Sequence, residues 1–331
     1  MNLSKVPDIP EHHRLSRTTL AWITQQNLWN LWVPESFGGV ECSLEEGLNT
    51  LQTLARHDGS LGWTVTLCAG ANFFIGNLQP EYAEKLFNGQ PVILGGSGGV
   101  FGSASPSNQG YHIQGRWRYA TGAPYLTHFT LSAKLTQNGK PVLNQQGGEA
   151  VKSFVLPAGQ VSVIDDWRTM GLKATATHSF AVQDAYADDI QSFTYDKVYL
   201  PQPLYQLDFG VFADLTLWVN YIGMAEHLYA ETVESKQLPA REQLKAVIHS
   251  ANADCQRLAA QCASLKAHNT VFEQSVVRDV HRTACASVAQ LNHAIVGLYP
   301  YSGIRAASTG SVVNQIFRDY FTATQHHIFT Q

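Results

Sequence analysis

The sequence predicts an α+β protein in which a middle antiparallel β-barrel or sandwich separates an N-terminal helical domain from a C-terminal helical bundle. Apolar residues recur at helical spacing up to about residue 88, alternate with a period of two from about 91 to 200, and return to helical spacing from about 208. We therefore expect domains at 1–88, 89–205 and 206–331. The chain of 331 residues is long enough for these units to bury a sizeable shared core.

The first unit carries two adjacent helical patterns. Leu44–Arg56 is amphipathic, with leucines on one face, and the Asp-Gly-Ser sequence at 58–60 separates it from an apolar run that begins at Leu61. Ser60–Pro80 has no charged residue, but it contains three glycines, two asparagines and two threonines, which makes it a poor membrane span. We expect a buried helix there.

The middle unit is predicted from four alternating segments. These are Tyr111–Tyr119, Phe129–Leu135, Val151–Leu156 and Phe180–Ala185. Turn-rich segments, among them Gly95–Gly102 and Asn144–Gly148, are expected to separate the strands. Roughly a hundred residues with this pattern are typical of a small antiparallel barrel or sandwich.

The last unit is predicted to be a bundle of longer helices. Ala240–Asn269 has a sustained apolar stripe, and the four apolar residues Val277, Ala284, Leu291 and Leu298 recur every seven residues. Helices with such stripes bury them against one another.

Charge and cysteine content exclude several classes of protein. Lys and Arg number 22 against 26 Asp and Glu, and no basic cluster is present, so a nucleic-acid partner is not expected. The five cysteines have neither zinc spacing nor an even count, which indicates reduced thiols in a cytoplasmic protein. The first ten residues lack the order of a signal peptide. We expect small molecules or further copies of the chain as partners.

Five segments resemble, in the right order, the landmarks of the acyl-CoA dehydrogenase superfamily. They are Leu31–Gly39, Asp58–Trp63, Gly110–Ala123, Asp166–Thr175 and Asn314–Tyr320. The resemblance covers nearly the whole chain and implies a flavin-binding subunit, with FAD or FMN as cofactor, that forms a homodimer or homotetramer. It also implies the helical, β and helical order predicted above.

Departures from the dehydrogenase pattern point to another branch of this superfamily. His327 occupies the place of the usual catalytic glutamate, and no acidic residue follows Asp319. Leu94–Pro106 replaces the substrate loop, and the motif that holds the FAD diphosphate is not found between Glu231 and Leu244.

The same differences resemble the two-component flavin monooxygenases (group D), which take reduced flavin from a separate reductase and use it to activate O2. Gly102–Ala104, followed by Gly110 and Tyr111, is similar to their loop motif, and His326 falls at the histidine of their last helix. Thr121 stands where they use a serine, and it keeps the hydroxyl.

The resemblance implies particular roles for site residues. Thr121 and the His326–His327 pair are the candidate catalytic residues, because a hydroxyl can hydrogen-bond flavin N5 and an imidazole can hold or deliver a proton near neutrality. The candidate flavin-contacting residues are Tyr119, Thr121, Gly122, Trp167 and Thr175. Each also has a plain structural interpretation, as a strand, core or tail residue. The bundle histidines His249, His281 and His293 lack acidic partners at ligand spacing, so no metal site is expected.

Two alternatives stay open at this point. One is an acyl-CoA dehydrogenase that oxidises a thioester with a displaced base, for which Asp214 is the nearest acid. The other is a flavin-free relative that serves as a scaffold or binding subunit, since the chain is short for the superfamily. The sequence names neither the substrate nor the choice between FMN and FAD, because fold alone does not carry function.

Overall fold

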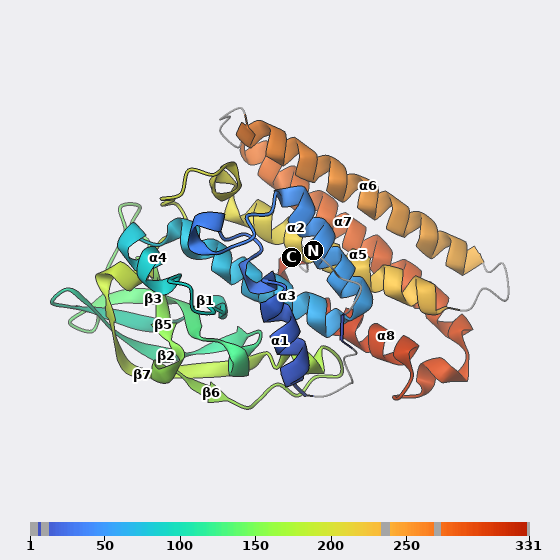
Figure 1. Ribbon diagram of the computed structural model, residues 1–331, viewed down its shortest axis with the longest axis horizontal. Coiled ribbons are helices and arrows are strands. Elements are labelled where there is room, and N and C mark those ends of the chain that lie inside the picture. The colour runs from blue at the N-terminus through green and yellow to red at the C-terminus, as the bar shows by residue number, and fades with distance from the viewer. Residues whose placement is uncertain (1–5, 8–12, 233–238, 268–272, 330–331) are drawn as a thin grey trace.

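A computed structural model describes residues 6–7, 13–232, 239–267 and 273–329. The observed order of elements is helices, then a sheet, then long helices, as the change in periodicity predicts. Figure 1 shows the sheet at one end of the molecule and the long helices α6 and α7 at the other, with α2, α3 and α5 between them.

The N-terminal helices are α1 (Arg17–Gln25), α2 (Leu44–His57), α3 (Gly59–Asn72) and α4 (Pro80–Leu86). Asp58 ends α2 and begins α3, and its Oδ1 accepts the Leu61 amide at 2.8 Å, so one residue explains the helix boundary predicted at 58–60. Nearly all residues of α3 are buried, which is why its apolar pattern has no polar face. Among the described residues, no helix is both long and apolar enough to cross a bilayer.

The eight strands form one sheet. They are β1 (Leu94–Ser107), β2 (Gly110–Ala120), β3 (His128–Gln137), β4 (Lys140–Pro141), β5 (Val151–Pro157), β6 (Ser162–Ile164), β7 (His178–Asp188) and β8 (Ser192–Phe193). The order is β6-β7-β2-β1-β3-β5-β8, with β4 paired to β3. The sheet is mixed rather than wholly antiparallel as expected, because β1 and β3 pair directly and run parallel. Along the chain, β2 lies between these two strands.

Gly95–Gly102, expected to be a turn-rich separator, is instead part of strand β1. Its glycines allow close packing within the sheet rather than chain reversal. A Cβ at Gly96 would lie 1.7 Å from the Thr130 carbonyl oxygen, and one at Gly102 would lie 2.2 Å from the Trp117 ring. The strand is also irregular, since its register against β3 shifts twice between Ser97 and Gly102.

The C-terminal helices are α5 (Phe209–Glu231), α6 (Pro239–Ala267), α7 (Gln274–Leu298) and α8 (Val312–Ala323). Of the seven-residue repeat, Ala284, Leu291 and Leu298 are buried and Val277 is packed against the core, which confirms the predicted stripe. The segment predicted to carry the other stripe, Ala240–Asn269, corresponds to α6, and its residues 268 and 269 lie outside the described ranges.

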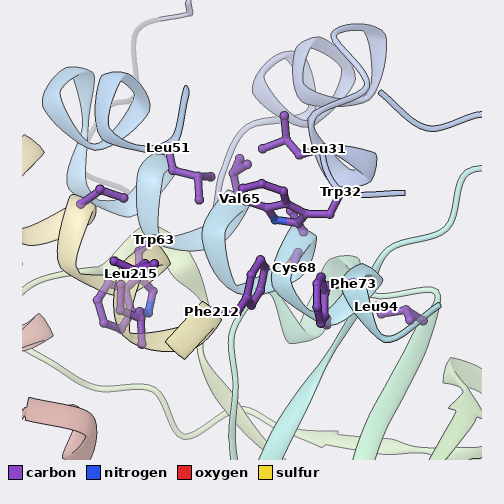
Figure 2. Close-up of a cluster of buried hydrophobic side chains, with 14 of the residues drawn as sticks. Leu31, Trp32, Leu51, Trp63, Val65, Cys68, Phe73, Leu94, Phe212 and Leu215 are labelled. Atoms are coloured by element: carbon purple, nitrogen blue, oxygen red, sulfur yellow. The ribbon is translucent and has the colours of Figure 1, made fainter. Parts of the chain in front are cut away.

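One hydrophobic core runs through all three segments. In Figure 2, Phe73 from the N-terminal segment stacks on Phe212 of α5 at 4.1 Å between ring centroids, and Trp32 meets the same ring edge-on at 5.2 Å. Asn72 joins α3 to the sheet, since its side chain accepts the Leu94 amide at 2.9 Å. The proposed boundary near 88 falls between α4 and β1, whereas the one near 205 falls within a short 3-10 helix, Pro203–Gln206. The division into separate domains stays a prediction.

Candidate functional site

The end of β2 places Thr121 and Gly122 against the segment that ends at Thr175. The Gly122 amide donates to the Thr175 carbonyl at 2.8 Å, and its φ of +74° suits glycine. Thr121 is almost buried, and the Cys68 thiol of α3 approaches its carbonyl oxygen at 3.8 Å. Residues 53 positions apart in sequence are thus joined at this turn.

Leu172 organises the segment that carries Trp167 and Thr175. Its carbonyl accepts from two side chains, the Trp167 indole Nε1 at 2.9 Å and the Thr175 hydroxyl at 2.7 Å, and from the Thr175 amide at 3.3 Å. Its amide donates to the buried Asp319 carboxylate on α8. Its φ of +49° is unusual for leucine, and these bonds together hold that backbone conformation.

Helix α8 fixes the same segment from the bundle side. The Gly171 amide donates to the Thr322 hydroxyl at 3.0 Å, and the Arg318 guanidinium donates to the Met170 carbonyl at 2.6 Å. A Cβ on Gly171 would lie 2.2 Å from the Arg318 carbonyl carbon, so only glycine allows this close approach. Arg318 and Asp319, which lie in the motif segment Asn314–Tyr320, therefore anchor the Leu172 segment to α8.

Three threonine hydroxyls form a chain with a defined direction. Thr175 donates its single hydroxyl proton to the Leu172 carbonyl. With the Thr175 proton on Leu172, Thr177, 2.7 Å from Thr175, donates to Thr175, and Thr121, 3.1 Å from Thr177, donates to Thr177. Thr121 Oγ1 therefore has lone pairs left for a ligand but no proton, and the site is an acceptor at this atom.

An aromatic pair borders these hydroxyls. The ring of Tyr119 meets the Trp167 ring edge-on at 5.6 Å, and Tyr119 is 45% exposed. The backbone amides of Asp166 and Trp167 both donate to Nδ1 of the buried His178, at 3.1 Å each. His178 is thus an acceptor at Nδ1, in keeping with a pKa that burial lowers.

His326 and His327 lie just beyond the end of α8. His326 packs edge-on against the buried Trp63 of α3 at 5.7 Å between ring centroids, and its neighbour His327 is exposed. Burial first, and the nearby His327 second, lower the pKa of His326 to about 4. The Ile328 amide donates weakly to Nδ1 at 3.4 Å, which leaves the proton of the neutral ring on Nε2.

The structure thus brings five predicted residues into one cluster and places two in another. Tyr119, Thr121, Gly122, Trp167 and Thr175 gather around Leu172 and Thr177. His326 contacts Trp63, and His327 contacts His326. Helix α3 bridges the two, because it carries both Trp63 and Cys68, which Figure 2 labels.

Sequence reasoning missed the residues that orient the predicted ones. Leu172 acts through its backbone, which no side-chain motif reveals. Thr177 lies two positions after Thr175 in a Thr-Ala-Thr sequence, a signal that pairing of the two hydroxyls could have used. Trp63 is visible only as an apolar residue of a buried helix.

Asp214, the candidate displaced base, is engaged elsewhere. Both of its carboxylate oxygens lie 3.2 Å from Nδ1 of His281 on α7, and burial raises its pKa. The two residues are 67 positions apart, so no local spacing in the sequence reveals this pair. The described part of the chain contains no group of three or more acidic, histidine or cysteine side chains arranged to hold a metal ion.

Two surface hollows lie away from the clusters. One of about 650 Å³ covers β1, β2 and β7 beside Phe101 and Gln183. The other, of about 880 Å³, lies between Gln261 of α6 and the first turns of α7, including His281.

No model of a known protein family matches the chain. It is similar to indole-3-acetate monooxygenase of Acinetobacter baumannii, 26% identical over 216 residues that cover 64% of this chain and 53% of the relative. It is also similar to HsaA, the oxygenase subunit of a flavin-dependent monooxygenase of Mycobacterium tuberculosis, 21% identical over 231 residues that cover 67% of this chain and 57% of the relative. The chain thus spans little more than half the length of these relatives.

A solved structure similar to this one is XiaF from Streptomyces sp. in complex with FADH2 and glycerol. Its TM-score is 0.85 at 19% identity, and the match covers 96% of this chain and 86% of XiaF. The fold is that of the acyl-CoA dehydrogenase-like flavin monooxygenases, which confirms the predicted fold class and the resemblance seen in the sequence motifs.

Proposed function

We propose that this chain, which has the acyl-CoA dehydrogenase-like fold of the flavin monooxygenases, is the oxygenase component of a two-component system. It would take reduced FAD or FMN and use O2 to hydroxylate a small organic molecule. The names of the curated relatives support this reaction, and the acceptor site at Thr121 carries the proposal in the structure.

Reduced flavin differs from oxidised flavin at N5, which bears a hydrogen only in the reduced form. The Thr121 hydroxyl is committed to Thr177 as a donor, so towards a ligand it can only accept. It therefore fits the N–H of reduced flavin and offers no donor to the bare N5 of oxidised flavin. This polarity favours a protein that receives flavin already reduced.

The neighbouring residues fit the remaining demands of a flavin ring. The exposed edge of Tyr119 and the Trp167 ring provide an aromatic wall. Gly122 keeps the turn after Thr121 free of a side chain, and a Cβ there would lie 3.2 Å from the Cys68 thiol. The flavin would supply the redox chemistry, and the protein would orient it and exclude water.

We assign to His326 the control of one proton. Because its pKa is lowered to about 4, the imidazole is neutral at pH 7 and carries its proton on Nε2. A neutral imidazole can take up one proton, which makes it a cation, and a pKa of about 4 means that it gives this proton back readily at pH 7. His327 is exposed, and its proposed role is to assist His326.

The substrate class, partners and compartment follow from the same proposal. An aromatic substrate is the first choice, because a named relative acts on indole-3-acetate. A separate flavin reductase would supply the reduced cofactor, and the subunit would act as a homodimer or homotetramer. The five cysteines are free thiols, which fits a reducing compartment such as the cytoplasm.

The test compares the binding of reduced and oxidised flavin under anaerobic conditions. We expect the reduced form to bind about fivefold more tightly, and Thr121→Val to remove most of that preference while Thr121→Ser keeps it, since one hydrogen bond contributes about 1 kcal/mol. Equal binding of both forms would refute the polarity of the hydroxyl chain. No binding of either form would favour the flavin-free alternative.

A second measurement addresses oxygen activation. Protein loaded with reduced flavin is mixed rapidly with oxygenated buffer, and the flavin spectrum is followed. A long-lived, blue-shifted absorbance before oxidised flavin returns would support a site shielded from water. Reoxidation as fast as that of free flavin would remove this support, and reduction of bound FAD by acyl-CoA thioesters would then be tested.

A further inference from the structure

A second set of chemically active side chains lies in the helical bundle. Asp214 of α5, His281 of α7 and Cys285 of α7 are arranged in line. The Asp214 carboxylate bonds Nδ1 of His281 at 3.2 Å, and Nε2 of the same ring lies 3.5 Å from the Cys285 sulfur. The proposed flavin chemistry uses none of the three.

The bonds fix the state of the imidazole. A carboxylate can only accept, so Nδ1 carries the proton and donates it to Asp214. In the neutral ring, Nε2 is then a bare acceptor directed at the Cys285 thiol. An oriented imidazole between a carboxylate and a thiol is the arrangement that activates a nucleophile.

The three residues differ in burial, since Asp214 is buried whereas His281 and Cys285 are partly accessible to solvent. Asp214 is 3% exposed, whereas His281 and Cys285 are half-buried. The hollow of about 880 Å³ between α6 and α7 includes His281 in its wall, so a small reagent can approach the imidazole from solvent.

The other thiols do not share this environment. Cys68, Cys255 and Cys262 are buried. Burial raises the pKa of Cys68 and of Cys255 to about 12 and that of Cys262 to about 11, which makes them inert. Cys42 is half-buried like Cys285, and burial and a nearby carboxylate raise the pKa of both thiols. The contact with Nε2 of His281 is what distinguishes Cys285.

We propose that Cys285, His281 and Asp214 form a peroxide-reactive thiol site, in which His281 is the base and Asp214 the positioning residue. The ligand is hydrogen peroxide, the two-electron oxidant released when flavin–oxygen chemistry is not coupled to a substrate. The site itself needs no flavin, so this proposal can be tested independently of the proposed function.

The reaction balances with these groups alone. Nε2 of His281 takes the thiol proton, and the sulfur attacks one oxygen of the peroxide. The S–O bond forms as the O–O bond breaks, and the departing hydroxide takes the proton from the imidazolium to give water. The sulfur is oxidised by two electrons to a sulfenic acid, and the peroxide is reduced. Burial and the Asp214 charge raise the pKa of Cys285, so the resting group is a thiol and the base is needed.

The test uses the full-length protein without flavin, reduced and then exposed to hydrogen peroxide in the presence of dimedone, which traps sulfenic acids. Peptide mass spectrometry gives the labelling rate of Cys285 relative to Cys42 in the same molecule. We expect Cys285 to be labelled at least about tenfold faster, which is less than the roughly hundredfold or more that a well-placed general base contributes. Equal or slower labelling of Cys285 would overturn the proposal.

Variants separate chemistry from loss of structure. His281→Gln at a half-exposed position, and the isosteric Asp214→Asn, should each reduce the ratio at least about fivefold. His293→Gln is the matched control, because His293 is exposed on the same helix and bonds only the Ala289 carbonyl among the described contacts. Melting temperatures check that each variant is folded. A ratio that His281→Gln leaves unchanged in folded protein would refute the role of the base.

Discussion

Replacing Gly171 by alanine tests whether α8 holds the candidate site in place. The added Cβ would lie 2.2 Å from the Arg318 carbonyl carbon and oxygen and 2.4 Å from the Asp319 amide nitrogen. Backbone atoms cannot rotate away as a side chain can, so the segment must move by about 1 Å or more to restore a normal contact.

The expected cost follows from what that movement disturbs. Overpacking costs about 1–3 kcal/mol. Weakening the Thr322 bond to Gly171 and the Asp319 bond to the Leu172 amide adds about 1–3 kcal/mol. A total of about 4 kcal/mol, with an unfolding entropy of about 2.1 cal/mol/K per residue, lowers the melting temperature by about 6 °C in two-state unfolding.

The assay is thermal unfolding followed by circular dichroism, with reduced-flavin affinity measured on the folded variant. We expect both to fall, because the displaced segment carries Trp167 and Thr175. Gly297→Ala is the control, since a Cβ there meets no atom within 4 Å on an exposed turn of α7, and it should stabilise the helix slightly. If Gly171→Ala melts within about 1 °C of the parent protein, the reasoning about α8 is wrong.

Two further predictions concern the protonation of His326 and the hydrogen bond that joins Asn72 of α3 to Leu94 of the sheet. Because burial depresses the pKa of His326 to about 4, its contribution to stability is complete above the unfolded value of 6.5 and is lost as pH falls towards 4. Urea unfolding measures the free energy of unfolding at pH 7.5 and at pH 4.5. The decrease between the two should be about 2 kcal/mol larger for the parent protein than for His326→Gln, and an equal decrease in both would contradict this prediction. Asn72→Ala should cost about 2–4 kcal/mol by leaving the buried Leu94 amide unpaired, whereas exposed Asn49→Ala should change unfolding by less than about 0.5 kcal/mol.

Local sequence signals predicted most elements because their physical causes are local. The boundary at 58–60 depends on one capping aspartate, and the stripe on α7 depends on helical spacing. Gly95–Gly102 failed because glycine has two uses that sequence cannot separate. It permits turns, but here it lets β1 approach Thr130 and Trp117, residues that only the folded sheet brings close.

The candidate site was predictable in its residue types but not in its connections. Thr121, Trp167 and Thr175 were identified from motif resemblance, and the structure gathers them. Their orientation depends on the Leu172 backbone and on Asp319, which is 147 residues away in the chain.

The sequence by itself determined the order of helices and strands, the fold class and the resemblance of its motifs to those of flavin monooxygenases, since periodicity, capping and motif spacing are written along the chain. Only the tertiary structure decided the direction of the threonine chain and the join between Asp214 and His281. Both depend on hydrogen bonds between distant residues, and a hydrogen-bond partner is defined by position in space rather than by position in sequence.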